Sequence, residues 1–461
     1  MAESVTKYQQ YAEYKDSGVE WLGKVPSHWT VSPLKLYIDT RKGVAFKSAD
    51  FTDTGVRVVK ASDIKDKTIQ QSDVFLPTYF SEIYPKAVLK AEDIVISTVG
   101  STPDVKNSAV GQIGMLPAML NNSLLNQNTV VFSPRKNTLE NLFLFYLIQT
   151  NVYRDHLDLN AHGTANQASL NVSDMLSFTF SLPLFQEQTQ IANFLDHETA
   201  QIDTLIEKQK VLIKLLKEKR QAVISHAVTK GLNPDAPMKD SGVEWLGEVP
   251  EHWEVSKIKY IAELTPSKAE VLSSLEKSCS FIPMEKLKLD TLILDETRKI
   301  KDVYQGYTYF KDGDVLIAKV TPCFENQNMA IATNLVNGIG FGSSEIYVIR
   351  TEAEGLNRFL LYRLQESVFM QLGAGAMTGA GGLRRVPSDF INNFQFALPP
   401  IVEQKEIVEH IEEMKSKFND LVDNAEKAIQ LMQERRTALI SAAVTGKIDV
   451  RGWVAPVLVA L

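Results

Sequence analysis

The side chains best suited to chemistry in this sequence are hydrogen-bonding groups gathered in six short loops. Residues 98–106, 126–128 and 162–167 form three such loops in the first half, and residues 319–327, 343–345 and 378–385 form three in the second. Asn and Gln can pair with adenine through two hydrogen bonds, Arg and Lys can pair with guanine, and Glu can accept from the amino group of cytosine. The loops therefore predict recognition of base edges.

Within these loops we expect contacts to DNA from a defined set of side chains. In the first half they are Thr98, Ser101, Lys106, Asn126, Gln127, Asn128, His162, Thr164, Asn166 and Gln167. In the second half they are Lys319, Thr321, Glu325, Asn326, Gln327, Ser343, Ser344, Thr378, Arg384 and Arg385. The Lys and Arg side chains would also contact phosphates and give binding its salt dependence. Polar loops are common, so the prediction depends on both halves placing such clusters at matching positions.

The sequence patterns that usually carry catalysis are missing. Residues 373–382 are rich in Gly but lack the G-x-G-x-x-G spacing, and Thr445-Gly446-Lys447 is followed by Ile, which excludes a Walker A loop. The seven His show no metal-ligand spacing, and there is no G-x-S-x-G motif. We therefore expect a non-catalytic chain without a metal or cofactor of its own.

Length and composition are those of a globular protein of several domains. The chain has 461 residues, of which 44% are hydrophobic and 23% charged. Its start lacks a basic segment before an apolar run, and no stretch approaches about 18 uninterrupted apolar residues, so we expect neither a signal peptide nor a membrane span. Cys279 and Cys323 are too few for a disulfide framework, which favours a cytoplasmic protein in which both simply pack. The net charge of −7 argues against indiscriminate coating of nucleic acid.

The elements that must position the polar loops occur twice. Residues 15–32 read KDSGVEWLGKVPSHWTVS, and residues 239–256 repeat fifteen of these eighteen positions. The two Trp of each copy, flanked by Gly and Pro, predict a turn-rich segment in which Trp21, Trp29, Trp245 and Trp253 pack as anchors.

Beyond these copies, the same order of elements is expected in each half: two buried strands, a helix, a Gly-rich loop and a helix capped by Ser-Asp. The predicted positions are 93–97, 129–132, 141–149, 162–167 and 173–174 in the first half, and 314–318, 346–349, 357–365, 373–382 and 388–389 in the second.

Each half ends in a long helix. Residues 186–229 and 402–445 each follow a Leu-Pro step and carry a hydrophobic repeat of 3.5 residues, the pattern of a coiled coil. One seam position is predicted at Leu195, Ile202, Gln209, Leu216 and Val223, and at Ile411, Phe418, Ala425, Met432 and Leu439. The other is predicted at Leu205 and Leu212, with Ile206 and Ile213 beside them, and at Met414 and Leu421. Antiparallel pairing within the chain is the economical arrangement, and it would place the two globular domains at opposite ends.

The expected fold class is α/β, with two pseudo-repeated α/β domains separated by two long antiparallel coiled-coil helices. The predicted boundaries are an N-terminal arm at 1–14, a first domain at 15–182, a central helix at 183–231, a second domain at 232–398, a C-terminal helix at 399–448 and a tail at 449–461.

On these residues the chain resembles the specificity subunit of type I restriction-modification systems. The resemblance covers essentially the full length. It rests on the doubled KDSGVEWLG-VP-HW words, on the Leu-Pro-x-x-x-Glu-Gln openings at 182–188 and 398–404, and on the Ile-Ser-x-Ala-Val-Thr endings at 224–229 and 440–445. The run DVLIAKVTPCFEN at 314–326 is similar to one common class of target-recognition domain.

The resemblance implies that each domain reads one half of a bipartite, asymmetric site in double-stranded DNA. It implies that the helices set the spacing and dock two DNA adenine methyltransferase subunits, and that motor-nuclease subunits complete the complex. S-adenosylmethionine, ATP and magnesium would belong to those partners, and no membrane is involved. Two alternatives stay open: a recognition subunit of another restriction type, and a two-domain scaffold that binds no DNA.

Overall fold

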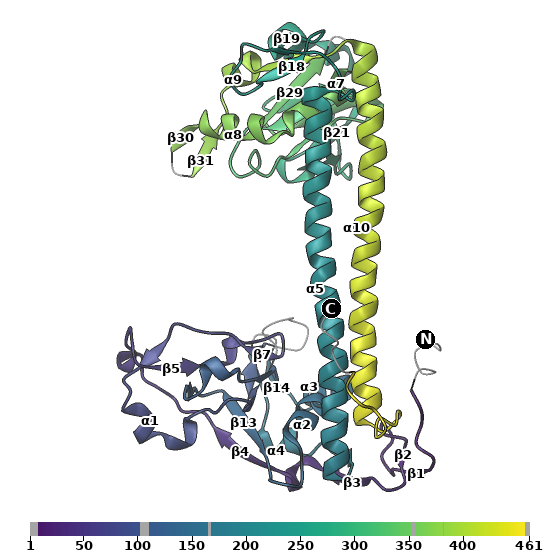
Figure 1. The fold of residues 1–461 in the computed structure, drawn as a ribbon. Coiled ribbons are helices and arrows are strands. Elements are labelled where there is room, and N and C mark those ends of the chain that lie inside the picture. The colour runs from purple at the N-terminus through teal and green to yellow at the C-terminus, as the bar shows by residue number, and fades with distance from the viewer. Residues whose placement is uncertain (1–7, 102–109, 165–166, 352–355, 381, 457–461) are drawn as a thin grey trace. The chain divides into compact units, whose positions relative to one another are not determined.

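The computed structural model describes residues 8–101, 110–164, 167–351, 356–380 and 382–456 (Figure 1). The contacts divide the chain into two compact units, Met1–Gln209 with Lys427–Leu461, and Lys210–Glu426. Each unit contains one globular α/β domain together with one segment of each long helix. The repeat in the sequence is therefore also a repeat of structure.

The first unit is built on a six-stranded sheet with smaller sheets beside it. The six strands lie in the order β4 (Ile38–Lys42), β13 (Thr129–Pro134), β9 (Ile94–Ser97), β11 (Ile113–Met115), β7 (Thr68–Ile69) and β6 (Ile64–Lys65). A second sheet has the order β12 (Leu124–Leu125), β5 (Val56–Val59) and β8 (Phe75–Leu76). A third has the order β10 (Val99–Gly100), β15 (Gln167–Ser169) and β14 (His162–Thr164). Two pairs remain, β1 (Tyr14–Asp16) with β2 (Lys24–Pro26), and β3 (Thr30–Pro33) with β16 (Thr179–Leu182).

The second unit repeats this plan with a four-stranded central sheet, β20 (Ala262–Leu264), β29 (Ile346–Thr351), β26 (Val315–Ala318) and β27 (Met329–Ile331). Its second sheet has the order β24 (Thr297–Lys299), β21 (Ser278–Ile282), β28 (Ile339–Gly342) and β25 (Thr308–Lys311). Four pairs complete it: β17 (Met238–Asp240) with β18 (Glu248–Pro250), β19 (Glu254–Lys257) with β32 (Gln395–Leu398), β22 (Leu287–Lys288) with β23 (Thr291–Leu292), and β30 (Thr378–Ala380) with β31 (Leu383–Arg385).

The helices of the first domain are α1 (Phe80–Ile83), α2 (Asn141–Leu147), α3 (Asn151–Leu159) and α4 (Val172–Leu176). Those of the second are α6 (Ile300–Val303), α7 (Leu356–Leu364), α8 (Ser367–Gly375) and α9 (Ser388–Asn393). The long helices are α5 (Phe185–Lys230) and α10 (Ile401–Val444). Among the described residues, no helix is both long and apolar enough to cross a membrane.

The central strands of each domain are buried on both faces. In β9, Ile94 and Ile96 join the core that also contains the long-helix residues, whereas Val95 joins a separate core with residues of β5 and β8. In β26, Ile317 and Leu316 divide between two cores in the same way. Because successive side chains of a strand point to opposite faces, a strand covered on both sides has an unbroken run of hydrophobic residues. The predicted buried strands are confirmed.

The repeated words of the sequence meet at the start of each long helix. In the first unit, Trp29 Nε1 donates to Glu187 Oε1 at 3.1 Å, and His28 Nε2 lies 2.9 Å from Glu187 Oε2. Glu187 Oε1 also accepts from the Tyr11 hydroxyl at 2.7 Å. Gln188 Nε2 donates to the carbonyl of Pro183 at 2.9 Å, which closes the first turn of α5. The Pro-x-His-Trp motif and the Leu-Pro-x-x-x-Glu-Gln motif therefore form one hydrogen-bonded cluster, which we call the lock. In the first unit it consists of Tyr11, His28, Trp29, Glu187 and Gln188.

The second unit repeats the lock with one donor fewer among the described residues. Trp253 Nε1 and His252 Nε2 lie 3.0 and 2.7 Å from Glu403 Oε2, and Gln404 Nε2 donates to the carbonyl of Pro399 at 2.7 Å. Trp29 and Trp253 are fully buried. The other two Trp stack on Phe rings, Trp21 on Phe178 at 4.9 Å and Trp245 on Phe394 at 6.3 Å between centroids. Packing in the core is confirmed for Trp29 and Trp253, whereas Trp21 is half-buried and Trp245 is 40% exposed.

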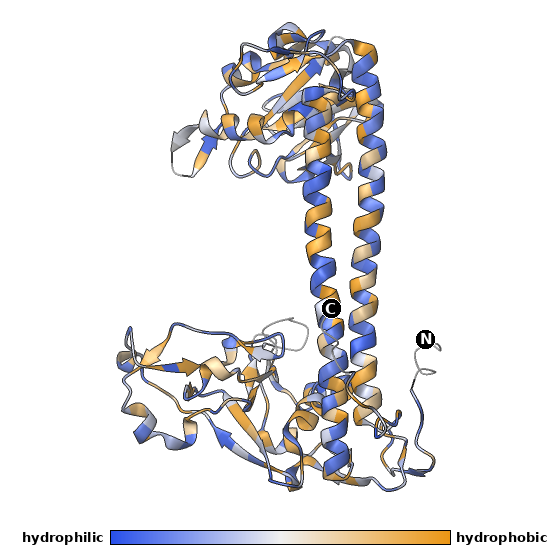
Figure 2. Ribbon diagram, viewed as in Figure 1, coloured by the Kyte–Doolittle hydropathy of each residue, from blue (hydrophilic) through white to orange (hydrophobic). Residues whose placement is uncertain are grey.

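In both units α5 and α10 run antiparallel. In the first, Arg436 Nε donates to Asp203 Oδ1 at 3.0 Å, and in the second, Arg220 Nη1 donates to Asn419 Oδ1 at 2.6 Å. A residue later in α5 meets a residue earlier in α10, and both pairs imply the same register. The predicted antiparallel pairing is confirmed, and Figure 2 shows the hydrophobic residues distributed along both helices.

The second seam position lies one residue later than the sequence predicts. Ile206 is 6% exposed and packs in the core, whereas Leu205 is 51% exposed. On α10, Val422 is 9% exposed and Leu421 is 50% exposed. Leu212 is exposed as well, so the assignment of Leu205, Leu212 and Leu421 to the seam was wrong. Residues three and four positions apart lie on the same helix face, so the hydrophobic repeat alone leaves both choices open.

Two local predictions also differ from the structure. The N-caps of α4 and α9 are Asn171 and Pro387, so the Ser173-Asp174 and Ser388-Asp389 pairs lie inside the first turn and are not caps. The run 373–382 is not a loop throughout, because its first three residues belong to α8. A Cβ on Gly373 would lie 2.5 Å from the Phe324 ring, so this glycine allows close packing of a helix.

Candidate nucleic-acid interface

In the second unit, the predicted site residues converge around the hairpin β30–β31. Thr378 pairs with Arg385 across the hairpin, which extends from the body of the domain beyond α8 (Figure 1). The segment that follows β26 lies beside the hairpin and is joined to it by one isolated β-bridge and by hydrogen bonds. Val320 forms a bridge with Arg385, the Thr321 amide donates to the Arg384 carbonyl at 3.0 Å, and Thr321 Oγ1 donates to the Gly382 carbonyl at 2.7 Å.

Charged side chains cross this junction. Arg385 donates to both oxygens of Glu345, from Nε at 2.8 Å and from Nη2 at 2.9 Å. Hydrogen bonding from Arg385 lowers the pKa of the Glu345 carboxyl below its ordinary value, so the carboxylate stays charged at neutral pH. Arg384 Nη2 lies 3.8 Å from Glu325 Oε1, a looser ion pair. Lys319 Nζ lies 5.0 Å from the centre of the Tyr347 ring, and the Lys319 amide donates to the Glu345 carbonyl at 2.9 Å.

The remaining candidates of the second unit lie in the segments 319–327 and 343–345, where several of them form local hydrogen bonds. The amides of Asn326 and Gln327 donate to the carbonyls of Pro322 and Phe324 at 3.0 and 2.8 Å. Ser343 Oγ accepts from the Glu345 amide at 3.2 Å, and Ser344 is exposed. Asn326 is exposed and Gln327 is half-buried, so both lie at the surface of the site.

In the first unit, the candidates that the structure describes at the same topological positions include no Lys, Arg, Asp or Glu. The Thr98 amide donates to the Asn128 carbonyl at 2.8 Å, and the Thr98 carbonyl accepts from the Leu170 amide at 2.9 Å. Thr98 thus joins the 126–128 loop to the hairpin β14–β15, which carries His162 and Gln167, both exposed. Ser101 follows β10, the third strand of that sheet. Lys106, Asn166 and the side chain of Thr164 lie outside the described residues.

The two hairpins are equivalent but differ in charge. β14 and β15 are separated from β30 and β31 by 216 positions, the offset that also relates the long helices. At this offset, the positions of Arg384 and Arg385 are occupied by Ala168 and Ser169 in the first unit. The two sites are therefore built on the same backbone frame and present different hydrogen-bonding groups.

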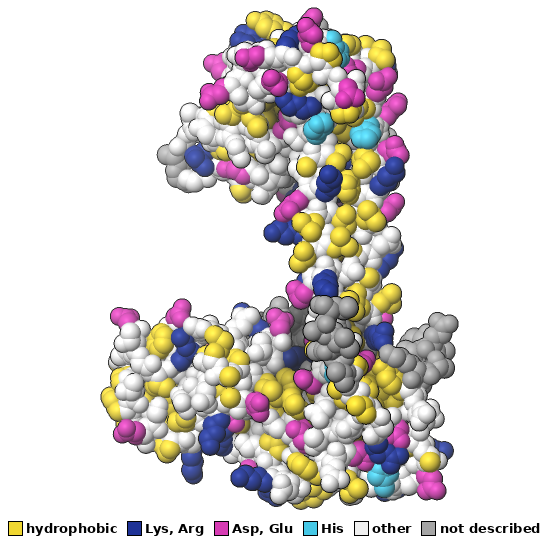
Figure 3. Space-filling model, in the orientation of Figure 1, with side chains coloured by type: hydrophobic (Ala, Val, Ile, Leu, Met, Phe, Trp, Pro, Cys, Tyr) yellow, Lys and Arg dark blue, Asp and Glu magenta, His cyan; other side chains and the backbone are white. Residues whose placement is uncertain are grey.

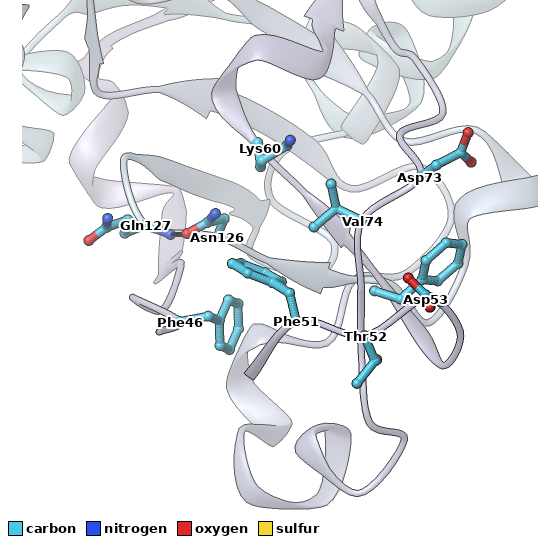
Figure 4. A pocket seen from close by; sticks show the side chains of 10 residues that line it. Phe46, Phe51, Thr52, Asp53, Lys60, Asp73, Val74, Asn126 and Gln127 are labelled. Atoms are coloured by element: carbon cyan, nitrogen blue, oxygen red, sulfur yellow. Dashed lines mark hydrogen bonds between the residues drawn. The ribbon is translucent and has the colours of Figure 1, made fainter. Parts of the chain in front are cut away.

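Asn126 and Gln127 also border a hollow of about 520 Å³ in the first unit (Figure 4). Asn126 Oδ1 accepts from the Gln127 amide at 2.6 Å, which turns the loop there. The other lining residues are Phe46, Phe51, Thr52, Asp53, Lys60, Asp73, Val74 and Phe75. Aromatic faces and amide edges can stack on and hydrogen-bond to a base, whereas the two carboxylates disfavour a phosphate.

Sequence reasoning missed Glu345 and these lining aromatic residues. Glu345 lies in a loop that the sequence singles out, but its partner Arg385 is forty positions away, and no local spacing connects them. Phe is a residue type typical of a protein core, so the sequence gives no sign that Phe46, Phe51 and Phe75 line a hollow; only the structure places them there. Among the described residues, no group of three or more His, Cys, Asp or Glu side chains is arranged to hold a metal ion.

Comparison with known proteins gives a consistent family. The family model described as type I restriction modification DNA specificity domain matches residues 26–215 and 250–431, more than half of the chain. The EcoAI type I restriction enzyme specificity subunit of Escherichia coli is 38% identical over 190 residues, 41% of this chain. The putative MjaX specificity subunit of Methanocaldococcus jannaschii is 23% identical over 449 residues, 93% of this chain and 96% of that one. The matches to the EcoAI and EcoEI subunits span only 32% and 27% of those two proteins.

Two solved structures share the fold. The HsdS subunit of Thermoanaerobacter tengcongensis matches with a TM-score of 0.54 and 16% identity, over 92% of this chain and 98% of that one. A structure from a study of complex assembly and conformational transition of the type I R-M system matches with a TM-score of 0.62 and 16% identity, over 91% and 98%. At this level of identity the likeness concerns the fold alone.

Proposed function

The chain belongs to the type I restriction-modification DNA specificity family, and we propose that it is the non-catalytic subunit that selects the DNA sequence of such a complex. Each domain reads one half of a bipartite, asymmetric site in double-stranded DNA. The observation that carries this proposal is the pair of equivalent junctions at β14–β15 and β30–β31, in each of which the segment after a central strand lies beside a hairpin and unlike side chains stand on a common frame.

Unlike side chains imply unlike half-sites. The second junction offers Lys319, Arg384 and Arg385, which suit guanine and phosphate, and the first offers Gln127, Asn128 and Gln167, which suit adenine. Two copies of one reader would favour a palindromic site. The divergence of the two junctions supports a site whose halves differ.

The long helices have two roles in this proposal. Their 46 and 44 residues, at about 1.5 Å per residue, give a length of roughly 65–70 Å, which limits the spacing of the half-sites to about 19–20 base pairs. They also dock two adenine methyltransferase subunits. In the second unit, Val211, Leu212, Leu215 and Leu421 are each 43–55% exposed, and Figure 3 shows hydrophobic side chains at the surface of the helices. Exposed apolar residues in a repeating pattern are typical of a protein interface.

Motor-nuclease subunits would complete the complex, and S-adenosylmethionine, ATP and magnesium would bind to the partners. The proposal places the complex in the cytoplasm, where its DNA is. The chain itself supplies recognition and spacing, and the partners supply methylation and cleavage.

The test is DNA binding by the chain together with an adenine methyltransferase subunit from the same host. We expect a fluorescence-anisotropy titration to show binding that weakens steeply between about 50 and 200 mM salt. Long-read methylation profiling of a host carrying both should show one bipartite motif. Absence of binding at low salt in the presence of the partner would leave the two-domain scaffold as the better account. A partner that also carries the nuclease on one chain would indicate another restriction type.

A further inference from the structure

The guanidinium of Arg385 is hydrogen-bonded to Glu345 along one edge, and its other edge is available to a ligand. Its Nε and Nη2 donate to the two oxygens of Glu345 at 2.8 and 2.9 Å, in the parallel fork that Arg forms with carboxylates. The backbone of Arg385 is fixed by the bridge to Val320 and by its pairing with Thr378. The orientation of the guanidinium plane is therefore set before any ligand arrives.

The remaining edge, formed by Nη1 and the second hydrogen of Nη2, has no hydrogen-bond acceptor among the described residues. The Arg385 side chain is 46% exposed, and that of Glu345 is 28% exposed. Two N–H groups on one edge match the O6 and N7 acceptors of guanine in the major groove. A guanidinium held in advance loses less conformational freedom on binding than one that swings free.

We propose that Arg385, held by Glu345, reads a guanine in the half-site of the second domain, and that Glu345 is a positioning residue for this contact. The inference rests on the proposed function. It adds the identity of one recognised base, a guanine, and of the residue that contacts it. A phosphate contact is the less suitable role, because the Glu345 carboxylate beside the guanidinium would repel a phosphate. Guanine presents neutral acceptors and is not repelled in this way.

The neighbouring Arg384 provides a matched control. It lies on the same strand and is similarly exposed, at 51% of its side chain, but its nearest carboxylate oxygen is 3.8 Å away on Glu325, beyond hydrogen-bond distance. Arg384 is therefore not held in one plane. If any exposed arginine on this hairpin sufficed, the two would behave alike.

The experiment uses the full chain in complex with its methyltransferase partner and duplexes carrying the methylation motif mapped in the host. Each guanine of the motif is replaced in turn by 7-deazaguanine, which lacks the N7 acceptor. We expect one replacement in one half-site to weaken binding by the wild-type complex about 5- to 150-fold. The same replacement should have no effect in Arg385→Ala. Glu345→Gln should reduce the effect of that replacement and do nothing further in the Arg385→Ala background. Arg384→Ala removes a residue that the proposed function also places at the DNA, so it should weaken binding to all duplexes alike and leave the 7-deazaguanine effect unchanged.

Three outcomes would overturn the inference. Replacement effects that are the same in wild type and Arg385→Ala would exclude the guanine contact. Uniform weakening of all sequences by Arg385→Ala, with a salt slope lowered by about 1, would identify a phosphate contact. A wild-type complex with no bipartite motif would overturn the proposed function and this inference together. If Arg385→Ala does not assemble, the comparison between wild type and Glu345→Gln decides, because loss of positioning must lower the 7-deazaguanine effect.

Discussion

At the scale of single residues, the carboxylate at the start of each long helix, Glu187 or Glu403, explains why the two most repeated motifs of the sequence occur together. Glu187 is 7% exposed and accepts from three donors, Tyr11, His28 and Trp29. A buried acceptor that loses its charge leaves donors poorly satisfied, and this is costly in a protein interior. The lock therefore contributes to stability.

We expect Glu187→Gln to lower the free energy of unfolding by about 1–3 kcal/mol, because an amide can offer the three donors only one oxygen. Glu403→Gln should cost less, since the Glu403 side chain is 24% exposed and has two donors among the described residues. Urea unfolding followed by tryptophan fluorescence measures both changes, because Trp29 and Trp253 lie at the locks. Glu218→Gln, on the 59%-exposed side chain of an i, i+4 pair with Lys214, is the control and should change little. Equal costs at all three positions would contradict the role of the lock.

At the scale of elements, the sequence predicted the strands, the helices and their antiparallel pairing, because hydrophobic period and repetition carry that information. It placed the second seam position one residue early, because the 3.5-residue repeat fits two faces equally well and only packing against the partner helix chooses between Leu205 and Ile206. For the candidate site it predicted the loops and missed the Glu345–Arg385 pair, which two distant segments form only after folding. A contact between segments that are far apart in the chain produces no motif with a recognisable spacing in the sequence.

The seam assignment predicts that substitutions at two neighbouring positions of the same helix will change the free energy of unfolding by very different amounts. Ile206→Ala should destabilise the first unit by about 2–3 kcal/mol, as expected for truncating a buried side chain, whereas Leu205→Ala should stay within about 0.5 kcal/mol. Val422 and Leu421 form the matching pair in the second unit, and Val422→Ala should again be the costlier change. Thermal unfolding of the full chain measures these changes. A larger loss for Leu205→Ala than for Ile206→Ala would restore the seam predicted from the sequence.

The exposed face of the helices predicts a defect in assembly without a defect in folding. Leu212 is 43% exposed, so Leu212→Glu should leave the melting temperature nearly unchanged. If this face docks the methyltransferase, the same change places a charge in an apolar interface and should weaken co-purification at least tenfold. Leu294→Glu, at a 40%-exposed position in the domain of the second unit, controls for the loss of an exposed apolar side chain. Unchanged co-purification would place the docking face elsewhere.

At the scale of the whole molecule, α5 and α10 both run through the two units. These helices can be shortened without altering a residue of either recognition domain. The Asp203–Arg436 pair of the first unit and the Arg220–Asn419 pair of the second have the same register, and in that register residues 208–214 of α5 correspond to residues 425–431 of α10. Deleting both segments removes one heptad from each helix and keeps the 3.5-residue pattern in phase. The seam is thus shortened and not broken.

This double deletion should shorten the gap between half-sites by at most about three base pairs, since seven residues rise about 10.5 Å and a base pair about 3.4 Å. Both half-site sequences should be unchanged, because the junctions at β14–β15 and β30–β31 are untouched. Methylation profiling of a host carrying the shortened chain and its partner measures gap and half-sites together. Deleting only residues 208–214 puts the helices out of register and should abolish methylation. Altered half-site bases with an unchanged gap would mean that the helices do not set the spacing.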